Sequence, residues 1–338
     1  MVHLRIVAPS DVAHRAVELL AASESVFNVV SVPGAATKPA GDLVLADVAR
    51  EDASVVVQDL AELDIPACGS ITIAPIETQL SDGAREAERH AAGLPGDAVI
   101  WEDVDARSEE LTELSTTFVA FVVIAMWIAA IGLVLDQPIL IVGAMVVGPE
   151  FGPLAGICVG IVQRQRELTR RSIVALAVAF PIGIAATLVF ALALKGFDQV
   201  PDNFAPGEHP LTSFIAQPDE LSFVIAFIAG VAGVLSLTSA KSGALIGVLI
   251  SVTTIPAASN VAVAAAFGEW GEAGGALGQL CINLVSIVAA GTITLYIQRR
   301  VYRARRLRHL SDPSRASGGL PVGFSSRTPP GRGQAGRH

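Results

Sequence analysis

The sequence is poor in charged and aromatic residues, which make up 16% and 5% of its 338 positions. An ordinary soluble domain carries about 25% charged residues, so this composition argues against a wholly soluble chain. Cysteine is also scarce. Cys68, Cys158 and Cys281 are scattered without C-x-x-C spacing, and two of them lie in apolar segments. These shortages argue against a disulfide framework and against a zinc site.

Signatures of catalysis are missing as well. The six histidines are dispersed, and no Gly-rich phosphate loop or nucleophile–base pair is visible. We therefore expect no enzyme, no cofactor and no bound metal. An RNA-binding front would need a basic, aromatic sheet face. Residues 1–110 instead have 20 acidic and 7 basic side chains, and Phe27 is the one phenylalanine before residue 80, so we expect no nucleic-acid partner.

Apolar residues are what the chain has in excess, with 52% hydrophobic residues and a mean hydropathy of +0.57. The acidic front is followed by an apolar middle and then by a basic tail, which has ten arginines and one acid from Arg299 onward. This pattern predicts a membrane protein with an extramembrane domain. Residues 1–5 lack the apolar core of a signal peptide, so we expect the N-terminus to be cytoplasmic.

Residues 1–80 predict a small α/β domain. The expected elements are strand His3–Ala8, a helix to Ala22, strand Val26–Val32, a turn at Pro33-Gly34, strand Leu43–Ala46, helix Glu51–Leu63 and strand Gly69–Ile76. Their order, β-α-β-β-α-β, is typical of a ferredoxin-like domain. The domain could assemble protomers into a homo-oligomer or sense a small ligand, and both roles stay open.

Flanking segments connect this domain to the membrane and end the chain. Residues 81–116 are expected to form a linker and a juxtamembrane helix at Ala106–Thr116, and Arg299–Arg308 should continue the last membrane helix as a basic stretch. Arginines at such a place can bind anionic lipid head groups. Beyond Ser311 the composition predicts disorder, so we expect residues 299–338 to be a mostly disordered tail.

Six apolar segments lie between residues 117 and 298, and roughly 20 residues suffice for a membrane-spanning helix. The segments are Thr117–Leu135, Gln137–Val162, Ser172–Leu194, Leu221–Thr238, Ser242–Phe267 and Ala276–Ile297. The loop 163–171 and the tail are rich in arginine, whereas the alternate loops are acidic. The positive-inside rule then predicts six spans in the cell membrane, with both termini in the cytoplasm.

The segments divide into two blocks of three, 117–194 and 221–297. The middle segment of each block has Gly-Ala near its start and is interrupted by proline, and the two match at an offset of about 103 residues. Because three is an odd number of spans, the blocks would have opposite orientations. Inverted repeats with paired broken helices are typical of secondary transporters, whose site lies between the breaks.

The first predicted break lies within Asp136–Gly156. Our candidate binding residues there are Gly148, Pro149, Glu150, Gly152 and Pro153. Proline removes a backbone donor, and freed carbonyls in a membrane need protein or water as a partner. Glu150 could be a structural carboxylate held at a helix N-terminus, or it could couple transport to a proton or cation. Glycines recur along this segment and also predict close helix packing.

The second predicted break lies within Ser251–Asn260. Our candidate binding residues there are Thr253, Thr254, Pro256 and Asn260. For Ser251 and Ser259 we favour a structural role, because Ser commonly bonds to backbone carbonyls in membrane helices. Pro181 in the third segment predicts a simple kink.

One motif indicates a family. The stretch Gly143–Gly156, read as G-A-M, an apolar pair and a proline-containing break, resembles the domain-of-unknown-function 389 family. The resemblance extends over the membrane block and implies a multi-pass membrane protein, while it carries over no substrate and no catalytic residue. This chain differs at Glu150, where the family often has an apolar residue.

Three functions are consistent with these features. The first is a secondary transporter or carrier of a small solute or ion, with its site between the two breaks. The second is a channel whose pore is lined by the small residues. The third is a membrane receptor or scaffold that moves no solute and in which the front domain is the active part.

Overall fold

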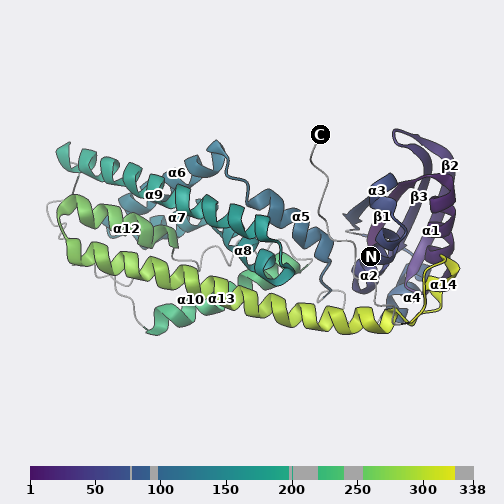
Figure 1. Cartoon of the computed structure of the whole chain (residues 1–338). Coiled ribbons are helices and arrows are strands. Elements are labelled where there is room, and N and C mark those ends of the chain that lie inside the picture. Colours follow the sequence, from purple (N-terminus) through teal and green to yellow (C-terminus); the bar gives the residue numbers. More distant parts are fainter. Residues whose placement is uncertain (77, 92–97, 198–199, 201–219, 240–253, 324–338) are drawn as a thin grey trace. The chain divides into compact units, whose positions relative to one another are not determined.

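The computed structural model describes all residues except 77, 92–97, 198–199, 201–219, 240–253 and 324–338. The chain divides into two compact units (Figure 1). Met1–Asp103 and Arg300–His338 form the first, which we call the α/β unit. Val104–Arg299 form the second, which we call the helical unit. Each unit is described by itself.

The α/β unit contains one antiparallel sheet of four strands in the order β2-β3-β1-β4. Its elements are β1 (Val2–Ala8), α1 (Ser10–Ala22), β2 (Val26–Thr37), β3 (Ala40–Val48), α2 (Arg50–Glu62), α3 (Ile65–Cys68), β4 (Ser70–Pro75) and α4 (Asp82–His90). In β1, alternate residues from Val2 to Ala8 are buried, as expected for a strand with one face on the core. The strands and the two longer helices therefore follow the β-α-β-β-α-β order predicted from the sequence.

One predicted turn is wrong. Pro33 and Gly34 lie inside β2, which continues to Thr37, and the chain turns at Lys38-Pro39 instead. β2 is an edge strand, and its pairing with β3 is irregular between Val32 and Ala36. Proline is tolerated at such an edge or bulge because no ladder hydrogen bond is lost there.

The C-terminal segment is part of the α/β unit. Beyond Ser311, where the sequence predicts disorder, the chain forms the short helix α14 (Ser314–Ser317), and the Arg315 side chain is only 1% exposed. Arg315 donates to the carboxylates of Asp59 and Glu62 on α2. The prediction of disorder is therefore wrong for residues 312–323, because composition alone does not show that Arg315 has buried acidic partners.

Glu51, in the first turn of α2, gives a pH-dependent prediction. Burial raises the pKa of its carboxyl above the ordinary value of 4.5, and the nearby Glu88 and Asp52 carboxylates raise it further, whereas the N-terminal amine acts in the opposite direction. Folding therefore favours the protonated form, and this contribution to stability is lost as the pH rises through the raised pKa. We expect Glu51→Gln to melt at a higher temperature than wild type at pH 8, with the difference shrinking toward pH 4.

Thermal unfolding of the full chain at several pH values measures this difference. Glu86→Gln is the matched control, because Glu86 is exposed on α4. A Glu51→Gln difference that stays constant with pH, or that is shared by Glu86→Gln, would contradict the assignment.

The helical unit contains the remaining helices. They are α5 (Trp101–Leu111), α6 (Thr116–Val134), α7 (Pro138–Val147), α8 (Phe151–Gln163), α9 (Arg166–Gly196), α10 (Glu220–Thr238), α12 (Thr254–Phe267) and α13 (Trp270–His309), of which α5 and α13 extend into the other unit. Three of them, α6, α9 and α13, are long and apolar enough to cross a membrane, and the bent pair α7–α8 would be a fourth. The helices are those of a membrane protein, while six spans are not established in the described part of the chain.

The predicted juxtamembrane helix is interrupted before the membrane segment. α5 ends at Leu111, and the Ser115 side chain accepts a hydrogen bond from the Phe118 amide at the start of α6. Serine at this position satisfies one of the free amides of a helix N-terminus. The stretch Ala106–Thr116 is thus the end of one helix and the cap of the next.

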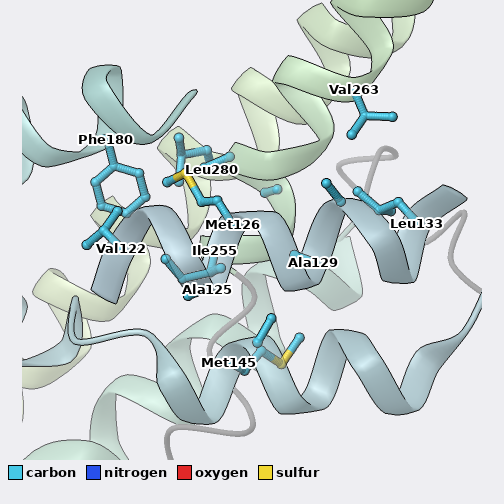
Figure 2. Close-up of a cluster of buried hydrophobic side chains, with 14 of the residues drawn as sticks. Val122, Ala125, Met126, Ala129, Leu133, Met145, Phe180, Ile255, Val263 and Leu280 are labelled. Carbon is cyan, nitrogen blue, oxygen red and sulfur yellow. The ribbon is translucent and has the colours of Figure 1, made fainter. Parts of the chain in front are cut away.

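The core of the helical unit is formed by α6, α7, α9 and α12, with Leu280 of α13 (Figure 2). Many of its buried residues are alanines, including Ala125 and Ala129 on α6 and Ala257 and Ala258 on α12. Small residues let helix backbones approach closely where lipid supplies no hydrophobic driving force. This core holds the N-terminal end of α12 against the break between α7 and α8.

Candidate functional site

The first broken stretch separates α7 from α8. α7 ends at Val147, α8 begins at Phe151, and their axes differ by 51°. Pro149 lies in the break itself, while Pro153 is in the first turn of α8, where a proline removes no helical hydrogen bond. The predicted break is therefore confirmed at Gly148-Pro149-Glu150.

The second broken stretch is described from Thr254 onward. α12 begins at Thr254, and Pro256 lies in its first turn, which is again a position that proline tolerates. Thr253 and Ser251 lie outside the described residues.

The N-terminal ends of α8 and α12 meet beside α9. Near the start of α9, Thr169 packs against Gly160 at the far end of α8. Near its other end, Lys195 donates to the carbonyl oxygen of Ala266 in α12 at 3.4 Å. At 1.5 Å per residue, α9 is about 46 Å long, and α8 and α12 are about 20 Å each. The two shorter helices therefore lie one after the other along α9, and from their meeting point they extend in opposite directions (Figure 1).

Glu150 and Thr254 join the two helix ends. The Thr254 hydroxyl donates to Glu150 Oε1 at 2.8 Å, and Glu150 is 2% exposed while Thr254 is fully buried. Glu150 Oε2 has no hydrogen-bond partner among the described residues. A carboxylate placed between two positive helix ends, with one oxygen open, can hold a proton or a cation.

Gly148 allows this contact. A Cβ atom at position 148 would overlap Glu150 Oε2 and would lie 2.8 Å from Ile255 Cγ1. Gly148 has φ −65° and ψ 128°, which any residue adopts, so the need for glycine is one of space. The absence of a side chain lets both the carboxylate and Ile255 approach the backbone.

The other predicted residues are divided between this junction and its surroundings. Asn260, two turns into α12, donates to Glu272 Oε1 of α13 at 3.0 Å. Gly152 packs against the backbone of Leu111, which is a packing role. Ser259 donates to the carbonyl oxygen of Met126 at 2.8 Å, consistent with the structural role we favoured. Pro181 lies within the uninterrupted helix α9.

Comparison with known proteins relates this geometry to a family. The model of a domain of unknown function (DUF389) matches residues 145–289, which include the described parts of both breaks. These residues are similar to that domain over somewhat less than half of the chain. The match confirms the resemblance predicted from the stretch Gly143–Gly156.

One relative of this chain is an uncharacterized protein of Methanocaldococcus jannaschii. The two are 24% identical over 191 residues, which cover 56% of each chain. The match thus spans little more than half of that protein's length. No solved structure matches.

The region that matches the DUF389 model also contains a polar stripe on α13 that the sequence interpretation missed. Gln279 and Asn283 are buried, and Gln279 donates to Asn283 at 3.3 Å, while Gln279 Oε1 has no partner in the described part of the chain. Glu272 lies two turns before Gln279 on the same helix. Polar residues at positions 272, 279, 283 and 286 share one helical face, and this spacing within an apolar segment is the signal that could have revealed the stripe.

Proposed function

We propose that this protein is a secondary transporter or carrier of a small solute or ion, with a binding site where α8 and α12 begin. The observation that carries the proposal is the buried hydrogen bond between Thr254 and Glu150, which lie 104 positions apart. Thr254 is the first described residue of α12, and Glu150 lies in the break before α8. Opposed half-helices that meet near the middle of a bundle are the usual site architecture of such carriers. The arrangement agrees with two inverted repeats, 117–194 and 221–297.

The chemistry of the site favours a proton or a cation as the transported or coupled species. Glu150 Oε2, Glu272 Oε2 and Gln279 Oε1 are buried acceptor oxygens without a hydrogen-bond partner among the described residues. Acceptors without matching donors suit a proton or another positively charged species. In this proposal Glu150 is the coupling residue, and the α/β unit is a cytoplasmic domain that senses a ligand or assembles protomers into a homo-oligomer.

Flux measurements in proteoliposomes test the site. We expect solute- or ion-driven flux in wild type, a reduction of at least about tenfold in Glu150→Gln, and a several-fold reduction in Thr254→Val, since losing one partner of a buried charged hydrogen bond costs about 1–3 kcal/mol. An internal pH dye reports protons, and ion-sensitive dyes report Na⁺ and K⁺.

Matched controls separate the site from general effects. Glu113→Gln removes an exposed carboxylate, and Thr294→Val removes a hydroxyl that bonds only to the Ala290 carbonyl oxygen within its own helix. Both should keep wild-type flux. If folded wild-type protein moves no solute or ion of a broad panel, the carrier hypothesis is contradicted and a receptor or scaffold is favoured. Unitary currents in planar bilayers would establish a channel instead.

A further inference from the structure

A basic, partly apolar pocket lies at the end of α8 that is distant from Glu150. Its volume is about 690 Å³, and it is formed where the chain turns from α8 into α9. The lining residues are Gly160, Ile161, Arg164, Arg166, Thr169, Arg170, Ile173 and Val174. Arg164 has a left-handed backbone, with φ 61°, and ends α8.

The pocket carries unneutralised positive charge. No described carboxylate forms an ion pair with Arg164 or Arg166. The one acid at this turn is Glu167, which pairs with Arg170 at 3.3 Å and with Arg171 at 2.8 Å. Two of the four arginines at this turn thus pair with its one carboxylate, and Arg164 and Arg166 do not. The tail arginine Arg306 differs, because it is committed to Asp59 and Glu62 within the α/β unit.

The other wall of the pocket is apolar and continues along α9. Ile161, Ile173 and Val174 are 41–50% exposed. Val178 and Ile182 extend this exposed apolar stripe by two turns. In a helix long and apolar enough to cross a membrane, such a stripe suits lipid chains. Arg166, at the first residue of α9 and two turns before Ile173, suits the depth of the head groups.

We propose that this pocket binds one anionic phospholipid. The phosphate would contact Arg164 and Arg166, and the acyl chains would lie on Ile161, Ile173 and Val174. The combination selects a lipid over a soluble anion, because an inorganic phosphate would leave the exposed apolar wall unused. The inference is independent of the carrier proposal and requires only that the helical unit lies in a membrane.

Native mass spectrometry of the full chain in detergent measures binding of phosphatidylglycerol, phosphatidylcholine and inorganic phosphate. We expect wild type to bind phosphatidylglycerol at least tenfold more tightly than phosphatidylcholine, and Arg164→Gln/Arg166→Gln to lose about tenfold or more of the phosphatidylglycerol affinity, since hydrogen bonds to charged groups contribute about 1.5–3 kcal/mol. Ile173→Asn should weaken binding of the same lipid several-fold by making the apolar wall polar.

The control is Arg85→Gln/Arg89→Gln, which removes the same charge from exposed positions of α4 and should leave binding unchanged. Equal losses in both double variants, or equal affinity of wild type for the two lipids, would overturn the proposal. Displacement of the lipid by excess inorganic phosphate would overturn it as well, by showing a site for a soluble anion. If the arginine variant did not fold, phosphatidylglycerol binding to wild type must still weaken with added salt, and a salt-independent affinity would count against the pocket.

Discussion

Replacing Asp59 by alanine is expected to lower the free energy of unfolding of the α/β unit by about 3–5 kcal/mol. Asp59 lies on α2 and is 1% exposed. Its carboxylate accepts hydrogen bonds from three basic side chains of the C-terminal segment, Arg306, His309 and Arg315. One buried acid therefore holds residues that are more than 240 positions away in the sequence.

The large expected effect comes from the partners that would remain. The Arg315 and Arg306 side chains are 1% and 11% exposed. Without Asp59 their charges would stay buried, with Glu62 as their remaining acidic partner in the described part of the chain. An uncompensated buried charge costs far more than the pair itself contributes. Either the two arginine side chains would then move into solvent, or the whole C-terminal segment would detach from α2.

Two measurements on the full chain test this expectation. Denaturant or thermal unfolding gives the loss of stability, and hydrogen exchange shows whether amides of residues 304–320 lose protection together with those of α2. Asp82→Ala is the matched control, because Asp82 is 96% exposed and pairs with the exposed Arg85. Such surface pairs contribute about 0–1 kcal/mol. A cost for Asp59→Ala no greater than that control would show that the network does not hold the segment.

The same network shows where the sequence is informative and where it is not. The strands of the α/β unit follow from local patterns, because alternating apolar residues such as Val2, Leu4 and Ile6 need only one buried face. The docking of Arg315 depends on two carboxylates of α2. The residues next to Arg315 in the sequence do not indicate this contact. Disorder was therefore predicted for a segment that its partners order.

In the helical unit the local signals at the breaks were strong. Proline and glycine at positions 148–153 interrupt an apolar run, and the structure has its 51° bend there. The pairing of this break with the start of α12 was also predicted, since the sequence has matching prolines at positions 153 and 256, and the contact between Glu150 and Thr254 brings the two together.

The partners of the site could not be predicted. Glu272 lies on α13, outside both proline-containing stretches, and its hydrogen bond with Asn260 of α12 is a tertiary contact. The packing role predicted for the glycines is found at some positions and not at others, because it also depends on tertiary neighbours. Gly148, Gly152 and Gly156 each pack against a neighbour. Gly143, in the same sequence pattern, has no atom of the described residues within 4 Å of an added Cβ atom.

This difference between two glycines gives the second large prediction. Gly148→Ala is expected to destabilise the helical unit by about 1–3 kcal/mol, the usual effect of overpacking. The added methyl group would overlap the Glu150 carboxylate and press on Ile255. Gly143→Ala should instead stabilise by about 0.5–1 kcal/mol, because Gly143 lies inside α7 in open space and alanine is the better helix former. Thermal unfolding of the full chain in detergent measures both.

A double variant distinguishes local crowding from a general loss of stability. Ile255→Val removes one methylene beside Gly148 and by itself should cost about 0.5–1.5 kcal/mol. If Gly148 and Ile255 pack against one another, the two changes must couple, and the double variant should be more stable than the sum of the single effects predicts. Additive effects would mean that the break after α7 and the first turn of α12 do not touch, and the binding site proposed between them would then lose its structural basis. A coupled pair, with flux reduced in Gly148→Ala and unchanged in Gly143→Ala, would tie transport to the junction itself.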